Sequence, residues 1–384
     1  MFPLVAIDAV ANMQNAWVAM SLRVEAADGD ANAALRNLFG EPDLLAAVAP
    51  LNCMLMLASP AVLDAAVLAL MPVTRVGFVI AADALRDNEQ RKRIASLHDD
   101  GYRILLDGPL PEGVSAPPGV TAVATDFSDS EPKGQVLPLV FGPHLAHGVN
   151  SAARHQQCAR VGYEWFSGAY PLHPAPNANP HDGSSRKRLM TLLGLLARDA
   201  ETREIEALLK QDPALSYHLL KLANSAAFVH STPIISFGQA ISVLGRRQLQ
   251  RWLQLLLYAR QQADGLPNPL LPLAAQRAAQ MESLCKLAGG ERDEQDLGFM
   301  TGVFSLLDLL FGMPMTEIVG ALNLPALAAD ALLTRSGRFG DMLALAEARP
   351  ASAAMIERAE LTPAQWLGSQ LHAYHWAIQV SRNL

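Results

Sequence analysis

A proline-rich segment divides this chain into two parts with different hydrophobic periods. Four prolines lie between Pro171 and Pro180, and a run with so few backbone donors continues neither a helix nor a central strand. Before this segment short apolar runs alternate with helical patterns, and after it the apolar period is that of an α-helix. We therefore predict a first domain over 1–170, a linker over 171–183 and a helical domain over 184–384.

The first part has the pattern of a mostly parallel sheet. Strands are predicted at Leu4–Asp8, Trp17–Arg23, Cys53–Leu57, Gly77–Ala81, Tyr102–Asp107, Val120–Thr125, Val136–Phe141 and Tyr163–Phe166. Helices are predicted at Ala61–Leu70, Arg86–His98 and Ser151–Arg160. Strands that alternate with helices predict an α/β fold, and about eight strands favour a TIM-type barrel. The connector Asp126–Gln135 has no apolar face for a helix, so we expect a degenerate barrel.

The second part is predicted to be an all-α bundle. Asp212 is a good N-cap, and Pro213 suits the first helical position. Ser236 is expected to cap a short helix that ends at Gly245. Further helices are predicted at Arg246–Gln261, Leu271–Leu287, Asp296–Phe311, Met315–Ala321, Ala326–Thr334, Gly340–Ala348 and Pro363–Ser381.

The composition is that of an ordinary globular protein. Of the 384 residues 51% are hydrophobic and 17% are charged, and the net charge of −7 argues against a surface that binds nucleic acid as a whole. The three cysteines are far apart in the sequence, which fits no disulfide framework. No Lys or Arg precedes Arg23, and the longest apolar run is too short to cross a bilayer. We therefore expect a soluble, cytoplasmic protein with no membrane partner.

The helical part carries a recognisable signature. It reads Asp-Pro-Ala-Leu-Ser-Tyr-His-Leu-Leu-Lys-Leu-Ala-Asn-Ser-Ala-Ala-Phe over 212–228 and Ser-Phe-Gly-Gln-Ala-Ile-Ser-Val-Leu-Gly over 236–245. This resembles HDOD domains, the all-helical output modules of bacterial signalling proteins, which look like HD-type phosphohydrolases without metal ligands. The resemblance implies that Ser305 and Leu306 stand where a His-Asp pair would bind metal. Neither side chain binds a divalent cation well, so we expect no metal there.

The strand order of the first part resembles the EAL domain, the barrel that hydrolyses cyclic di-GMP. Hydrolysis of that kind needs carboxylates that hold two divalent ions and activate a water. The resemblance implies that Ala19 replaces a metal-binding Glu, because Arg23 matches the Arg that follows it. At four further positions the resemblance implies that an apolar or small residue replaces a functional one. Met56 stands in place of an Asn, Val79 in place of a Glu, Gly108 in place of one Asp of a pair, and Ala124 in place of a Lys. Asp107 and Asp126 are kept, while Asn150 and Ser167 stand for a Glu and a Gln.

Two other patterns have open interpretations. His144, His147, His155 and Cys158 could bind zinc, but they straddle a predicted turn and helix, and packing histidines are the simpler interpretation. Between Pro213 and Ala263 there is no Asp or Glu. That stretch carries five cations: Lys221, Arg246, Arg247, Arg251 and Arg260. They could bind an anion, DNA phosphates in a helix-turn-helix, an acidic protein or the partner domain, or form a solvated face.

Together the two resemblances imply a bacterial signal-transduction protein whose catalytic groups are lost. We predict a non-catalytic regulator or scaffold, a pseudoenzyme without cofactor, that acts by protein–protein interaction in cyclic di-GMP signalling. One alternative is a sensor that binds cyclic di-GMP without cutting it. The other is a DNA-binding regulator, although we do not expect nucleic acid to be the main partner.

Overall fold

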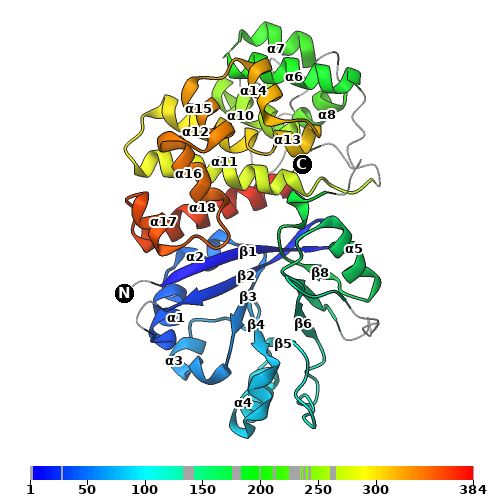
Figure 1. Cartoon of the computed structure of the whole chain (residues 1–384), viewed down its shortest axis with the longest axis vertical. Helices are drawn as coiled ribbons and strands as arrows, with labels where there is room; N and C mark the ends of the chain where they lie inside the picture. Colours follow the sequence, from blue (N-terminus) through cyan, green and yellow to red (C-terminus); the bar gives the residue numbers. More distant parts are fainter. Residues whose placement is uncertain are drawn as a thin grey trace. The chain divides into compact units, whose positions relative to one another are not determined.

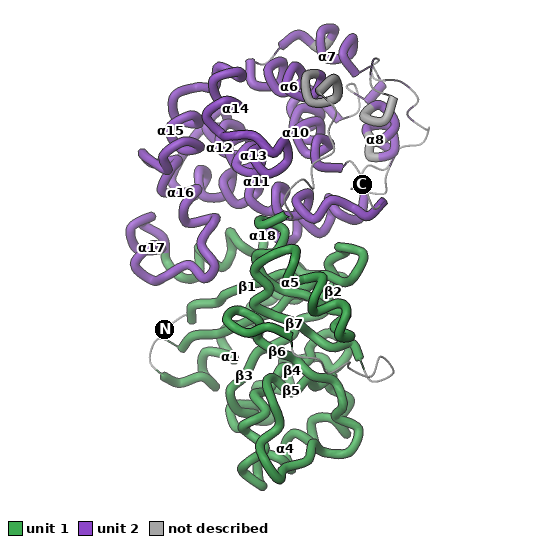
Figure 2. Tube along the Cα trace, turned by 45° about the vertical axis from the view of Figure 1, so that its right-hand side comes forward, with its two compact units in different colours: residues 1–176, 362–371 green, residues 177–361, 372–384 purple. Residues whose placement is uncertain are grey.

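The computed structural model describes residues 3–26, 29–132, 142–174, 183–198, 200–209, 211, 213–224, 234, 236, 239–240, 244–259 and 265–383. The predicted strand Val136–Phe141, the cap at Asp212 and the cation Arg260 lie outside them. The chain divides into two compact units, residues 1–176 with 362–371 and residues 177–361 with 372–384 (Figure 2).

Strands β1 to β8 of the first unit close into a barrel in sequence order (Figure 1). Their bounds are Leu4–Asn12, Trp17–Glu25, Asn52–Leu57, Val76–Ala81, Arg103–Asp107, Val123–Asp126, Leu145–His147 and Trp165–Phe166. Each strand from β2 to β7 runs parallel to the next, whereas β1 is antiparallel to both β2 and β8. The predicted α/β barrel is confirmed, with its first strand reversed.

The reversal of β1 follows from the short connection between β1 and β2. The side-chain Oδ1 of Asn12 accepts hydrogen bonds from the backbone N–H groups of Gln14 (2.9 Å) and Ala16 (3.0 Å). Asn15 takes a positive φ of 58°, a conformation that asparagine tolerates better than most residues. A turn this tight joins only antiparallel strands, since a parallel pair needs a crossover of about a dozen residues.

Short helices connect the parallel strands. They are α1 (Ala31–Phe39), α2 (Asp43–Ala47), α3 (Ala65–Leu68), α4 (Asn88–Asp99) and α5 (Ala152–Arg160), with 3-10 turns at Pro60–Val62, Ala82–Arg86 and Tyr170–Leu172. Side chains of Asp30, Asp87 and Ser151 accept backbone N–H groups at the starts of α1, α4 and α5.

Three predictions for the first unit need correction. The helix predicted at Ala61–Leu70 is a 3-10 turn followed by the single-turn α3, because the side chain of Asp64 caps a new helix inside the range. Helices α1 and α2 were not predicted. The segment around His144–His147 was interpreted as a turn, but it contains β7, which hydrogen-bonds to both β6 and β8.

His155 on α5 packs as a neutral aromatic ring. It stacks on Tyr170, with ring centroids 4.4 Å apart and an interplanar angle of 16°, and it lies 4.2 Å from the ring of Phe166. Burial lowers the pKa of His155 from 6.5 to about 4, because the surroundings penalise the charged imidazole. Its Nε2 atom is enclosed and makes no hydrogen bond in the structure.

This packing predicts how His155 affects stability against pH. Since the pKa is lower in the folded protein, the unfolded chain binds the proton first, and the stability present above about pH 6.5 declines as the pH falls towards about 4. His155→Phe should keep the stacking and remove this decline. Urea unfolding of both proteins across that range tests it, and equal pH dependence of the two would contradict it.

The second unit is helical. Its elements are α6 (Gly183–Ala197), α7 (Thr202–Leu209), α8 (Pro213–Ala223), α10 (Arg246–Leu256), α11 (Leu270–Leu287), α12 (Arg292–Phe304), α13 (Leu307–Phe311), α14 (Met315–Leu322), α15 (Ala326–Thr334), α16 (Gly337–Glu347) and α17 (Ala353–Arg358). The last helix, α18 (Pro363–Asn383), belongs in part to each unit. Among the described residues no helix has both the length and the apolarity needed to span a membrane.

Helix α11 is the buried centre of the second unit. It packs along α12, and two glycines of α12 permit the close approach. A Cβ on Gly298 would lie 2.6 Å from Sγ of Cys285, and one on Gly302 would lie 2.5 Å from the carbonyl oxygen of Arg277. Only a residue without a side chain lets the two helix backbones meet at this distance.

Most predicted helices are present, and two corrections concern their ends. The helix predicted over Asp296–Phe311 is interrupted, because α12 ends at Phe304 and α13 begins at Leu307. At the break the hydroxyl of Ser305 donates to the carbonyl of Gly302 at 2.8 Å. Helix α10 ends at Leu256, five residues before the predicted Gln261. Helices α7 and α17 were not predicted.

The cap predicted at Ser236 agrees with the structure, while the short helix that Gly245 was expected to end lies mostly outside the described residues. The hydroxyl of Ser236 accepts the backbone N–H of Gln239 at 3.2 Å, as an N-cap side chain does. Gly245 has a φ of +74° and directly precedes α10. A residue with a Cβ would be strained in that conformation, which explains why a glycine stands there.

Candidate functional site

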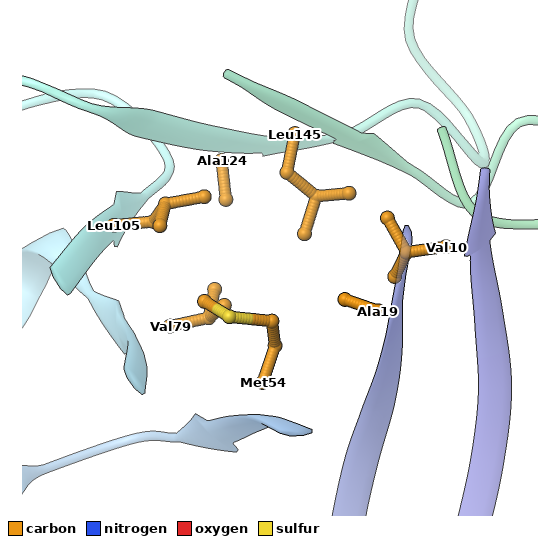
Figure 3. Packing of buried hydrophobic residues seen from close by; sticks show 7 residues of the cluster. All are labelled: Val10, Ala19, Met54, Val79, Leu105, Ala124 and Leu145. Carbon is orange, nitrogen blue, oxygen red and sulfur yellow. The ribbon is translucent and has the colours of Figure 1, made fainter. Parts of the chain in front are cut away.

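The interior of the barrel is filled by a layer of apolar side chains. Figure 3 shows them pointing toward one another from seven different strands. The layer consists of Val10, Ala19, Met54, Val79, Leu105, Ala124 and Leu145, and none of them is more than 1% exposed. Three of these residues, Ala19, Val79 and Ala124, stand where the EAL resemblance expects two carboxylates and a lysine. The structure therefore brings them together, but as a hydrophobic core.

Met56 lies beside this apolar layer and packs against it. Its sulfur is 3.7 Å from Nη2 of Arg23, the arginine that fixed the placement of Ala19. A thioether is a weak acceptor for a guanidinium and a poor ligand for Mg²⁺ or Mn²⁺. The position expected to hold an asparagine ligand therefore contributes packing and one weak polar contact.

Asp107, at the end of β5, pairs with a histidine that the sequence did not single out as its partner. Nε2 of His147 on β7 is 2.8 Å from Oδ1 of Asp107, and the two side chains are 9% and 24% exposed. Gly108 follows with a φ of +89°, a backbone conformation that an aspartate would adopt only with strain. The pair of aspartates expected here is thus replaced by one aspartate bonded to an imidazole.

Asp126 ends β6 and organises the turn that follows. Its Oδ1 accepts the backbone N–H of Ser128 at 2.9 Å and the Ser128 hydroxyl at 2.6 Å. Partial burial alone would raise the pKa of Asp126, but these two hydrogen bonds, with His147 and Arg23 nearby, lower it below its usual value. A Cβ on Gly148 would lie 2.3 Å from the same Oδ1, so a glycine is needed beside the carboxylate.

Asn150 and Ser167 also form hydrogen bonds with nearby backbone groups. The side-chain amide of Asn150 donates to the carbonyl of Ser128 at 3.2 Å. Ser167 is 5% exposed, and its backbone bonds to Ala146 and Val149. Within the part of the chain that the structure describes, no three His, Cys, Asp or Glu side chains come together in a way that would hold a metal ion. The residues present at the strand ends do not fit a divalent metal centre.

The four residues considered for zinc lie in separate surroundings. Nδ1 of His144 accepts the backbone N–H of Val123 at 3.1 Å, and His147 binds Asp107. His155 is stacked between aromatic rings, and burial raises the pKa of the Cys158 thiol to about 11. A thiol that stays protonated is a poor zinc ligand. The arrangement is that of packing histidines.

In the helical unit, Ser305 and Leu306 occupy the break between α12 and α13. Leu306 is 1% exposed and faces the core. The Ser305 hydroxyl accepts a hydrogen bond from Nη1 of Arg277 at 3.0 Å. Arg277 is itself 5% exposed and was not singled out in the sequence. A buried guanidinium thus lies against the position where the HDOD resemblance places the lost His-Asp pair.

The basic stretch between Pro213 and Ala263 meets acidic partners from outside it. Arg251 forms a bidentate ion pair with Glu282 of α11 and also binds Asp296 of α12 at 2.8 Å. Its guanidinium carbon lies 4.7 Å from the ring centre of Phe299. Arg247 reaches the same Asp296 at 2.6 Å. These arginines hold α10 against α11 and α12.

The other two described cations add little to a basic surface. A guanidinium nitrogen of Arg246 donates to the carbonyl of Ala200, which ties α10 to the start of α7. Lys221 on α8 is exposed.

Comparisons with known proteins agree with this architecture. Residues 186–303 match the HDOD domain family. The chain is 26% identical over 269 residues to "Cyclic di-GMP phosphodiesterase CdgJ" of Vibrio cholerae, a match that covers 69% of this chain and 61% of that protein. It is 27% identical over 237 residues to the protein YuxH of Bacillus subtilis, covering 61% of this chain and 55% of that one. The match thus spans less than two thirds of each relative.

Two solved structures are similar to parts of this chain. The first is the EAL domain of Mycobacterium smegmatis DcpA, with a TM-score of 0.35, 17% identity, and coverage of 43% of this chain and 90% of that chain. The second is an HDOD domain protein from Geobacter sulfurreducens, with a TM-score of 0.31 and 17% identity. The match covers 49% of this chain and 82% of that chain.

Proposed function

We propose that this chain, which joins an EAL-like barrel to an HDOD helical domain, is a non-catalytic regulator in cyclic di-GMP signalling. The apolar layer of the barrel carries the proposal. Ala19, Val79 and Ala124 close the barrel interior with hydrophobic contacts at positions where hydrolysis would need charged groups. Filling that space with packed side chains stabilises the barrel and excludes the water that would attack a phosphodiester.

The remaining acidic groups support the same proposal. A phosphodiesterase of this type needs carboxylates that are free to bind two divalent ions. Asp107 is bonded to His147, and Asp126 accepts both hydrogen bonds of Ser128. Each carboxylate thus has a structural use, and among the described residues no group of three His, Cys, Asp or Glu side chains forms around either.

The link to cyclic di-GMP rests on the relative from Vibrio cholerae, which is named as a phosphodiesterase of that nucleotide. We propose that the chain works in such a network by binding proteins. The paired arginines of α10 argue against a nucleic-acid partner, because Arg247 and Arg251 are neutralised by Asp296 and Glu282.

Titration calorimetry with cyclic di-GMP and Mn²⁺ separates a protein-binding regulator from a nucleotide sensor. We expect no saturable heat, because the barrel interior offers hydrophobic side chains in place of metal ligands. A second titration without Mn²⁺ reports binding that needs no metal. Saturable binding in either experiment would contradict a purely protein-binding role and would favour the sensor.

A further inference from the structure

Helices α15 and α16 form a compact hairpin in the helical unit. Only Arg335 and Ser336 separate Thr334, the last residue of α15, from Gly337, the first of α16. The two helices meet closely behind this turn, since a Cβ on Gly340 would lie 2.2 Å from the carbonyl carbon of Arg335. The hairpin packs on the central helices, with α16 against α11 and α15 against α12.

Glu347, the last residue of α16, is shared by two arginines. Its carboxylate accepts Nε and Nη2 of Arg335 at 2.8 and 2.9 Å, which is a bidentate ion pair inside the hairpin. The same carboxylate accepts Nη1 of Arg277 at 3.2 Å, which joins the hairpin to α11. One carboxylate therefore fixes the turn of the hairpin and attaches the hairpin to the core.

The two arginines need this carboxylate for different reasons. Burial lowers the pKa of Arg277 to about 10, so the side chain stays charged at neutral pH while only 6% exposed. That buried charge is satisfied by the Glu347 carboxylate and the Ser305 hydroxyl, so loss of Glu347 would remove its charged partner. Arg335 has a φ of 53°, a conformation that costs a residue with a Cβ about 1 kcal/mol. Its ion pair, with the bonds from Nη1 to the carbonyls of Ala331 and Leu332, holds it there.

We propose that Glu347 is a latch that holds the α15–α16 hairpin on α11, and that this hairpin opens as one unit when the latch is released. This proposal goes beyond the loss of catalysis, because it names the element of the helical domain whose position an interacting molecule could change. Opening would break the Arg277 pair, the bonds from Arg338 to Glu294 and Ala288, and the packing of α16 on α11, while the hairpin's internal contacts stay in place. The rigid turn makes the two helices move together.

Hydrogen exchange of the full chain, followed by mass spectrometry of its peptides, tests the latch. Glu347→Gln removes the carboxylate charge from both arginines while keeping the size of the side chain. We expect exchange in 326–347 to rise by about tenfold or more, with the amides of α11 and α12 almost unchanged.

Two further variants make the result specific. Arg335→Gly relieves the positive φ and leaves Arg277 paired with Glu347, so it should fold and leave exchange in 326–347 close to that of the unaltered chain. The control is Asp341→Asn, which removes an exposed carboxylate from the same helix α16. We expect a much smaller rise there. If Glu347→Gln does not fold, Glu347→Asp decides, because the shorter side chain keeps the charge but weakens its reach to Arg277, and the same rise confined to 326–347 is expected. In the Glu347 variant, equal exchange in the hairpin and in α11–α12, or an unchanged hairpin, would overturn the latch.

Discussion

A glutamate in place of Val79 is expected to destabilise the barrel by about 3–5 kcal/mol at neutral pH, because it leaves a charge buried without a partner. Val79 is 1% exposed and lies in the apolar layer (Figure 3), and its register partners in the sheet are Met56 and Leu105. Val79→Glu returns the carboxylate that the EAL resemblance expects at this position. The six other side chains of the layer are apolar and carry no hydrogen-bond donor to receive it.

The stability lost in the Val79→Glu variant should increase as the pH rises. Burial would raise the pKa of this glutamate in the folded protein above its usual value of about 4.3. The penalty is therefore small when the carboxyl is protonated, and it grows as the pH rises through the unfolded-state pKa. Urea unfolding at about pH 5 and at neutral pH measures it. The control Val79→Ala should lose stability equally at both. If Val79→Glu were as stable as Val79→Ala at neutral pH, the glutamate would not be buried, which would contradict the packed apolar layer.

Valine in place of Gly302 is expected to destabilise the helical unit by about 3 kcal/mol or more, because it overpacks two helix backbones. The nearest atoms to a Cβ there are the carbonyl oxygen of Arg277 and the backbone of Ala278, at 2.5 and 2.7 Å. Backbone atoms cannot rotate away as a flexible side chain does, so α11 and α12 must separate. That separation would also disturb the nearby Arg277–Ser305 hydrogen bond.

Gly320 provides the matched control. It also lies inside a helix, α14, but nothing stands within 4 Å of the position of its Cβ. Gly320→Ala should therefore leave stability unchanged or raise it by up to about 1 kcal/mol, through the better helix propensity of alanine. Thermal unfolding of both variants checks the contrast. Similar melting temperatures for Gly302→Val and the unaltered chain would contradict the close helix contact.

Local patterns were sufficient to predict most of the barrel. Strands such as β3 and β4 are continuous apolar runs, which is what a parallel strand covered on both faces requires. β7 was missed because three residues, Leu145–His147, are too few to show a period, and its flanking histidine and glycine favour a turn. Its existence depends on closing the barrel between β6 and β8, which is a long-range condition.

The ion-pair partners of the arginines could not be predicted from the sequence, for a different reason. The cations of 213–263 looked like a basic face because the count covered only their own segment. Their partners Glu282 and Asp296 come from α11 and α12, which tertiary packing brings to α10. Arg277 carried one usable signal, a charged residue within a long apolar helix, and such residues are almost never fully buried unless paired. Its partner Glu347 is 70 residues away.

The proposed loss of catalysis is tested most directly by incubating the purified chain with cyclic di-GMP and Mg²⁺ or Mn²⁺ and following the nucleotide by chromatography. We expect no turnover above the protein-free blank, because apolar side chains occupy the positions where metal ligands would be required. The Asp107→Asn variant is measured alongside to detect a contaminating enzyme. Metal-dependent turnover that disappears in Asp107→Asn would contradict the account, since it would make Asp107 part of a working catalytic centre.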